Sequence, residues 1–181
     1  MLEARDHRGF FVPQLSLEDF MEIYELREAL EGIASRRAAQ SARRTELADQ
    51  MDALLEEQRA AVAEGDLAAY GELDVQFHQL IWSESGNRRL AGVADNLFGQ
   101  MRIGNNISAQ APGRPEASLR EHAAIVAAVR DGDDRGAERA VRLHVRTAGK
   151  ALAKLLQSGG RPEHATRDGL MASEAWSEQR G

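Results

Sequence analysis

Hydrophobic residues recur every three or four positions from about residue 16 to residue 156, which is the spacing of amphipathic helices. Ser16-Leu17-Glu18-Asp19 has the form of a helix start, with an acidic residue three positions after the cap. A first helix is therefore expected to run to about Ala39. Its predicted apolar positions are Phe20, Ile23, Leu26, Leu30, Ile33 and Ala34.

Five more helices are expected from the same spacing and from residues that start or stop helices. Thr45, Asp66 and Asn87 are the expected caps of the second, third and fourth. Residues 104–117 are rich in glycine, asparagine and proline, which predicts a loop. Ser118-Leu119-Arg120-Glu121 then has the form of a capping box for a fifth helix. Asp133 or Asp134 is expected to open a sixth, ending near Leu156.

These elements predict an all-α fold, an antiparallel bundle of about six helices, because the connections between them are short. Residues 1–15 are expected to form a short arm, since Phe10-Phe11-Val12 favours a strand that Pro13 ends. Residues 16–158 are expected to form the helical domain. Residues 159–181 are polar without a helical stripe and are expected to be a disordered tail.

The composition supports this fold class and excludes several kinds of function. The 181 residues are 43% hydrophobic and 5% aromatic, and there is no cysteine, which excludes disulfides and thiolate sites. The net charge of −6 does not favour a nucleic-acid-binding chain. No apolar run approaches the roughly 20 residues that span a bilayer, so we expect a cytoplasmic protein without membrane contact.

Four side chains that can bind a metal fall where apolar residues are expected. Asp74 and His78 are four residues apart and so share one face of the third helix. His122 and His144 lie within the apolar stripes of the fifth and sixth helices. Burying a carboxylate and three imidazoles is costly unless something holds them together. A divalent metal ion would do so.

Three imidazoles and one carboxylate, without sulfur, suit Zn²⁺, with Ni²⁺ or a similar ion as the alternative. An ion with an open coordination position could bind a small carboxylic acid, and an arginine could pair with the far end of that ligand. Arg27 and Arg102 are the candidates for this role. Two other hypotheses stay open here: a metalloenzyme that uses the same four residues, and a structural bundle whose core histidines only form hydrogen bonds.

The order of several motifs resembles the FCD domain, the C-terminal effector-binding domain of the FadR-type branch of GntR-family bacterial transcription regulators. The motifs are Leu26-Arg27-Glu28-Ala29-Leu30-Glu31, Gly65-Asp66, Leu73-Asp74-Val75-Gln76-Phe77-His78, Ser85-Gly86-Asn87, Glu121-His122, Asp131-Gly132-Asp133 and His144. The resemblance covers roughly residues 16–156. Six helices, rather than seven, are closer to the VanR-like subgroup.

The resemblance implies a helical bundle that is not an enzyme, binds a divalent metal and senses a small carboxylic acid. Asp74, His78, His122 and His144 match the metal-binding positions of the family, and Arg27 matches an arginine near its pocket. The family also implies a homodimer that binds DNA through an N-terminal winged helix. Here Arg8-Gly9-Phe10-Phe11-Val12 resembles only the last strand of that wing, so we expect no operator binding by this chain alone.

Overall fold

The computed structural model describes residues 3–4, 10–11 and 15–158, and these include six long helices. Their bounds are α1 Leu17–Ala39, α2 Arg44–Glu64, α3 Leu67–Glu84, α4 Arg88–Ala109, α5 Arg114–Asp131 and α6 Asp134–Gln157. The predicted all-α bundle of about six helices is therefore confirmed.

Four of the predicted helix starts are correct. Ser16 forms the capping box of α1: its hydroxyl accepts from the Asp19 backbone N–H at 3.1 Å, and its own N–H donates to Asp19 Oδ2 at 2.7 Å. The side chains of Asp66, Asn87 and Asp133 cap α3, α4 and α6. The predicted cap Thr45 is wrong, because α2 begins at Arg44 and has no side-chain cap.

The predicted loop over residues 104–117 is mostly helix. α4 continues to Ala109, since Gly104 lies against the Tyr24 ring and the Asn105 side chain is buried and hydrogen-bonded. Tertiary packing here outweighs the weak helix propensity of glycine and asparagine. α5 begins four residues earlier than Ser118: Gly113 adopts φ 72° before it, and Pro115 fills its first turn. Ser118 is therefore buried inside α5 and does not cap it, and Glu121 accepts a hydrogen bond from Arg114. The predicted capping box is wrong.

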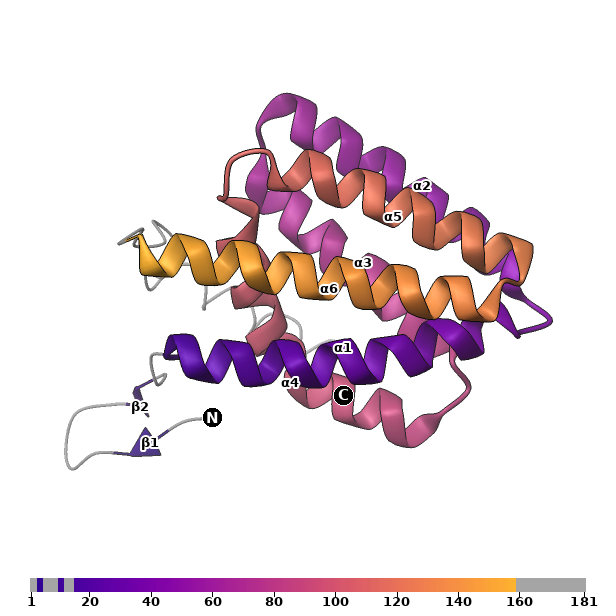
Figure 1. The fold of residues 1–181 in the computed structure, drawn as a ribbon, viewed down its shortest axis with the longest axis horizontal. Coiled ribbons are helices and arrows are strands. Elements are labelled where there is room, and N and C mark those ends of the chain that lie inside the picture. The colour runs from indigo at the N-terminus through magenta and orange to yellow at the C-terminus, as the bar shows by residue number, and fades with distance from the viewer. Residues whose placement is uncertain (1–2, 5–9, 12–14, 159–181) are drawn as a thin grey trace.

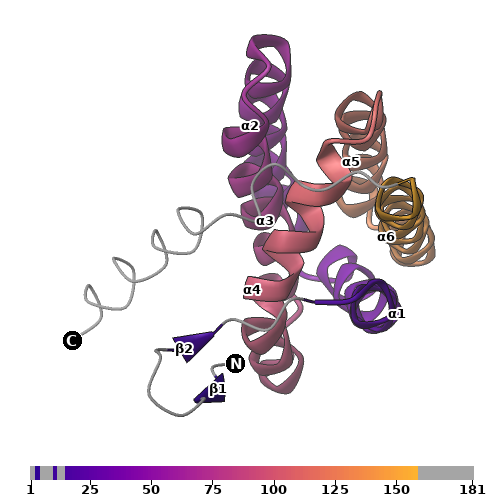
Figure 2. The ribbon, with the colours of Figure 1, turned by 90° about the vertical axis from the view of Figure 1, so that its left-hand side faces the viewer.

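The six helices form an antiparallel bundle. α1 and α6 run side by side in opposite directions at the front of Figure 1, and α5 lies beside α6. The end-on view in Figure 2 shows α2, α3 and α4 to the left of α1, α5 and α6, so that the core lies between the two groups. The centre of the core consists of side chains that are 0% exposed: Phe77, Ile81, Met51, Ile125, Val129, Val141, Val145 and Leu152.

Two predicted core positions of the first helix lie on its outer side. Phe20, Ile23 and Ala34 are buried, whereas Leu26 is 51% exposed and Ile33 is 44% exposed. The helix therefore has more apolar residues than it buries against the rest of the bundle. α1 therefore carries an apolar face with no partner in the described part of the chain.

Near the N-terminus, β1 (Glu3–Ala4) pairs antiparallel with β2 (Phe10–Phe11), with Glu3 opposite Phe11 and Ala4 opposite Phe10. The strand expected at Phe10 thus has a partner strand. The rest of the arm and the tail predicted over residues 159–181 lie outside the described residues. None of the described helices is both long and apolar enough to cross a membrane.

Candidate metal centre

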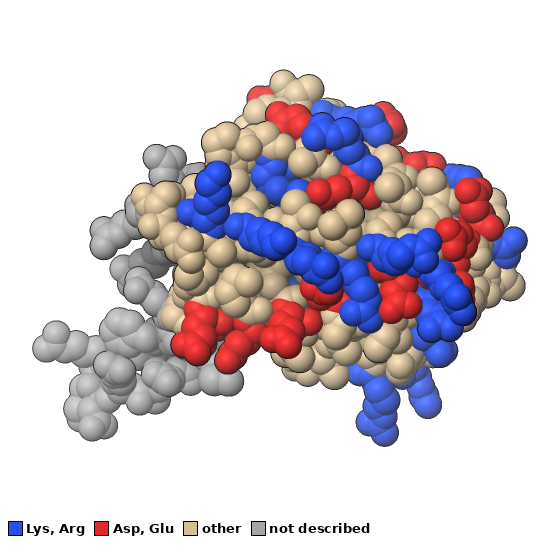
Figure 3. All heavy atoms as spheres, viewed as in Figure 1, with Lys and Arg blue, Asp and Glu red and all other residues tan. Residues whose placement is uncertain are grey.

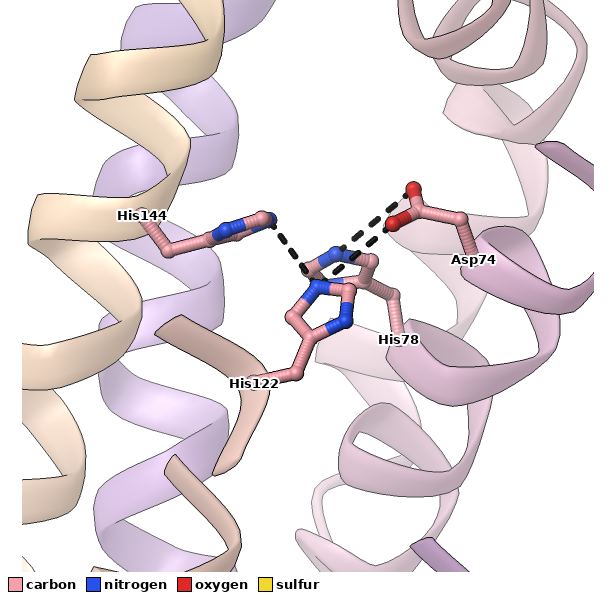
Figure 4. A group of neighbouring side chains, drawn as sticks. All are labelled: Asp74, His78, His122 and His144. Atoms are coloured by element: carbon pink, nitrogen blue, oxygen red, sulfur yellow. Dashed lines mark hydrogen bonds and ion pairs between the residues drawn. The ribbon is translucent and has the colours of Figure 1, made fainter. Parts of the chain in front are cut away.

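Asp74, His78, His122 and His144 meet in the interior of the bundle. One nitrogen or oxygen atom from each lies within 4.8 Å of the others, and all four side chains are buried. Figure 4 shows them pointing toward one another from α3, α5 and α6. His122 Nε2 lies 3.4 Å from His144 Nε2 and 3.5 Å from Asp74 Oδ1, and His78 Nε2 lies 3.9 Å from Asp74 Oδ2.

The other nitrogen of each histidine faces an oxygen atom from elsewhere in the bundle. His122 Nδ1 donates to Gln58 Oε1 of α2 at 2.8 Å, and His144 Nδ1 lies 2.8 Å from Glu121 Oε2. His78 Nδ1 lies 2.6 Å from Glu31 Oε2 of α1, close enough for an ion pair although the contact is not aligned as a hydrogen bond.

We assign the proton of each ring to Nδ1, the nitrogen that lies nearest an oxygen acceptor; for His78 the assignment rests on the nearness of the Glu31 carboxylate alone. His144 Nδ1 also lies 3.3 Å from Arg114 Nη2, a contact that would need the opposite assignment. We assign its proton toward Glu121, because that contact is shorter and joins the ring to a carboxylate. The three Nε2 atoms then present lone pairs to the centre of the site.

Asp74 is held by a chain of polar contacts that reaches α1. Asn105 Nδ2 of α4 donates to Asp74 Oδ2 at 2.5 Å, and Asn105 Oδ1 accepts from Arg27 Nη1 at 2.7 Å. Arg27 Nε donates to Glu31 Oε1 at 2.8 Å. Arg27 and Glu31 are buried, at 1% and 0% exposed, so this pair is shielded from water. Through Glu31 the chain returns to His78.

Burial and the neighbouring cations set the protonation states of these groups. Burial, together with the charges of His144, His78 and Arg114, lowers the pKa of His122 well below its usual value. Burial and the charges of His78 and Arg114 do the same for the pKa of His144. Burial raises the pKa of Asp74. Burial alone would also raise the pKa of Glu31, but the charges of Arg27 and His78 lower it to about 2.

The donor set fits a divalent transition metal ion. Neutral imidazole nitrogens and one carboxylate are ligands that Zn²⁺ accepts, and oxygen partners on the far nitrogens of ligating histidines are a usual feature of such sites. His78 Nε2 is buried and has no hydrogen-bond partner among the described residues. Two unprotonated nitrogens 3.4 Å apart, as in His122 and His144, repel each other unless a cation or a proton lies between them.

The two arginines singled out from the sequence lie in different surroundings. Arg27 joins the network at Asn105 and Glu31. The Arg102 side chain is 30% exposed and its Nε pairs with Glu72 Oε1 at 3.1 Å, so its place in a ligand pocket stays a prediction.

Sequence reasoning missed Arg114, which is 5% exposed and forms two hydrogen bonds with Glu121, at 2.9 Å and 2.6 Å. It also missed the polar residues that contact the histidines and Asp74, namely Glu31, Gln58, Asn105 and Glu121. For Glu31 and Gln58 the available signal was a polar residue within a predicted helix stripe, as it was for the histidines. Asn105 and Arg114 gave no such signal, because both lie in the segment predicted to be a loop, and Glu121 was assigned to the predicted capping box.

Two hollows on the described surface lie away from the four residues. One, of about 530 Å³, is lined by Arg37, Gly86, Asn87, Arg88 and Arg89. The other, of about 350 Å³, lies between α1 and α6 and has Tyr24 and Gly149 among its lining residues. Neither hollow is lined by any of the four converging side chains.

Comparison with known proteins places the chain in a family. Residues 22–147 match the FCD domain. The HTH-type transcriptional repressor RspR of Escherichia coli K12 is 26% identical over 157 residues, covering 87% of this chain and 68% of that protein. A probable D-xylose utilization operon transcriptional repressor of Paenarthrobacter nicotinovorans is 31% identical over 147 residues, covering 80% of this chain and 63% of that protein.

Solved structures share the fold. Escherichia coli McbR/YncC has a TM-score of 0.74 at 20% identity, covering 84% of this chain and 77% of that chain. Streptococcus agalactiae GntR has a TM-score of 0.64 at 20% identity, covering 83% of this chain and 74% of that chain. The family and these relatives are transcription regulators and not enzymes, so the metalloenzyme hypothesis is not favoured. The chain therefore belongs to the FCD-domain family of GntR-type transcriptional regulators.

Proposed function

We propose that this chain is a metal-dependent sensor of a small carboxylic acid and the dimerisation module of a GntR-type regulator. Asp74, His78, His122 and His144 would bind the metal, with zinc as the preferred ion and nickel as the alternative. Arg27 and Arg102 are the proposed ligand-binding arginines. Contact with an operator would come from a winged helix that residues 15–158 do not contain, and we propose a cytoplasmic location.

The observation that carries the metal proposal is the convergence of four buried ligand atoms within 4.8 Å. The far nitrogens of the histidines are held by Glu31, Gln58 and Glu121, which orients the three rings before any ion arrives. Four protein ligands would complete a tetrahedral zinc shell, so a small ligand would bind the ion only in a five- or six-coordinate arrangement.

The charge balance around the site supports an anionic effector. With the three imidazoles counted as neutral, Asp74, Glu31 and Glu121 contribute three formal negative charges, and Arg27 and Arg114 contribute two formal positive charges. All five side chains are buried or mostly buried. The site alone is therefore negative by one charge, which favours a cation. A divalent ion would make it positive by one charge, and a monocarboxylate would then neutralise it.

The test measures metal content and melting temperature of the purified chain, before and after loading with Zn²⁺. We expect about one ion per chain, as for a single zinc site. His122→Ala should lose the ion and melt at a lower temperature. Small carboxylic acids should raise the melting temperature of the loaded protein and leave that of the metal-free protein unchanged.

Met51→Ala is the matched control for the cavity that His122→Ala creates. Met51 is buried in the core on α2 and belongs to no part of the polar network. This variant should melt earlier yet keep its metal. The proposal fails if the wild-type chain takes up no ion, or if His122→Ala binds as much metal as Met51→Ala.

A further inference from the structure

The Asn105 amide lies between two buried groups of opposite charge. Its Nδ2 donates to Asp74 Oδ2 at 2.5 Å, and its Oδ1 accepts from Arg27 Nη1 at 2.7 Å. Asn105, Asp74 and Arg27 are 6%, 4% and 1% exposed, and no ion pair joins Arg27 directly to Asp74 in the described part of the chain. A single side chain therefore separates a carboxylate from a guanidinium inside the bundle.

The burial of these two charges makes their separation important. On the surface, acidic and basic side chains lie next to one another in Figure 3, and water screens the attraction between them. Arg27 and Asp74 lack this screening, so their attraction is stronger than that of an exposed pair. Without an intervening group, the two charges would be drawn into direct contact.

An amide fits this position because its two ends have opposite hydrogen-bonding character. A carboxylate only accepts hydrogen bonds and a guanidinium only donates them, so the partners fix which end of Asn105 faces each. An aspartate at position 105 could bond to Arg27 alone, and a leucine could bond to neither partner. Burying an amide is costly unless its polar atoms are bonded, and here both ends are.

Packing around Tyr24 of α1 holds the guanidinium on the Asn105 oxygen. Arg27 Cζ lies 5.0 Å from the centre of the Tyr24 ring, and the Tyr24 hydroxyl lies 3.5 Å from Asn105 Oδ1. Arg27 Nε donates to Glu31 Oε1 at 2.8 Å, which fixes the guanidinium on a second side. Arg27 is therefore held in one place while the amide bonds to Asp74.

We propose that Asn105 is a positioning residue that keeps Arg27 from pairing with Asp74. A direct ion pair would give the carboxylate a fixed counter-cation, which would compete with a metal ion for its charge. With the amide between them, Asp74 keeps its negative charge for the ion, and Arg27 keeps its positive charge for the carboxylate of a ligand. The role of Asn105 rests on the proposed metal site and adds the residue that separates its charges.

Asn105→Leu tests this role in the full chain, because it removes both hydrogen bonds at similar side-chain volume. Arg27 should then pair with Asp74, and the Zn²⁺ dissociation constant should rise roughly 10- to 100-fold, as measured by competition with a chromophoric chelator. Asn106→Leu is the matched control: it is the same change one position along α4, where Asn106 Oδ1 has no hydrogen-bond partner among the described residues. This control should bind zinc as tightly as wild type.

Arg27→Gln separates competition by the guanidinium from loss of packing. Added to Asn105→Leu, it should lower the dissociation constant at least tenfold, roughly, whereas in wild type its effect should be smaller, because the amide already separates the charges. Equal effects in both backgrounds, or unchanged zinc affinity in Asn105→Leu, would overturn the proposal. If Asn105→Leu does not fold, the same cycle with Asn105→Ala decides between these outcomes. A wild-type chain that takes up no zinc would overturn the metal site as well, which distinguishes the two failures.

Discussion

Each histidine of the candidate metal centre depends on a neighbour that sets which of its nitrogens faces inward. For His122 that neighbour is Gln58, which is fully buried on α2 and accepts from Nδ1 at 2.8 Å. Without this acceptor the ring could rotate or take the other tautomer, and Nε2 would no longer offer a lone pair to the site. The residues around the ligands are therefore as much a part of the site as the ligands.

Gln58→Leu should weaken Zn²⁺ binding by roughly 10- to 100-fold, because the substitution removes the acceptor at similar side-chain volume. The dissociation constant is measured by competition with a chromophoric chelator. Gln58→Glu is the control, since it keeps an oxygen acceptor at the same position and should bind zinc about as well as wild type. Equal affinities for folded Gln58→Leu and wild type would show that the contact does not orient His122.

At the scale of helices, the close packing of α1, α4 and α6 depends on two glycines around one buried ring. A Cβ atom added at Gly149 of α6 would lie 3.0 Å from Tyr24 Cδ1, and one added at Gly104 of α4 would lie 3.1 Å from Tyr24 Cε2. Tyr24 is 3% exposed, and its hydroxyl lies 3.5 Å from Asn105 Oδ1. The helices thus approach closely where the polar chain to Asp74 begins.

Gly149→Ala should lower the free energy of unfolding by about 1–2 kcal/mol. The added methyl group crowds the Tyr24 ring, and this destabilisation is larger than the stabilisation from the higher helix propensity of alanine. Urea unfolding measures the change. Gly92→Ala on α4 is the matched control, since no atom lies within 4 Å of its added Cβ, and this change should stabilise the protein by up to about 1 kcal/mol. If the two variants are equally stable, the close approach of the helices at Tyr24 does not affect the free energy of unfolding.

At the scale of the whole molecule, the polar network joins all six helices. Glu31 comes from α1, Gln58 from α2, Asp74 and His78 from α3, and Asn105 from α4; α5 gives Glu121 and His122, and α6 gives His144. An ion at the centre would therefore stabilise the whole bundle rather than one segment. A ligand that changes its coordination would act on every helix at once.

Removal of the metal should therefore lower the melting temperature of the whole bundle in one transition. For an ion present at about 100 times its dissociation constant, binding contributes about 2.7 kcal/mol, or roughly 5–10 °C for a chain of this size. Melting followed by circular dichroism in a chelator, and again after zinc is restored, measures the shift. If the melting temperature of metal-loaded protein is the same with and without the chelator, the ion has no structural role. That result would favour a bundle whose core histidines only form hydrogen bonds.

The sequence by itself determined the helices and the four candidate ligands. Helical spacing and the caps Ser16, Asp66, Asn87 and Asp133 mark most helix boundaries, because these signals are local to the chain. Asp74, His78, His122 and His144 could be selected because each occupies an apolar position, and such positions face the interior in any helical bundle. Their order along the chain also indicated the family, which the matched domain confirms.

Only the tertiary structure decided which residues surround those ligands and which apolar residues stay outside. Gln58 and His122 are 64 residues apart, and Asn105 and Asp74 are 31 apart, so their contacts depend on how the helices pack. Packing also kept α4 helical through Gly104 and Asn105, where local propensity predicted a loop. Leu26 and Ile33 have the same helical spacing as the buried residues of α1. Their exposure follows from the direction in which α1 faces the bundle, and local sequence cannot specify this direction.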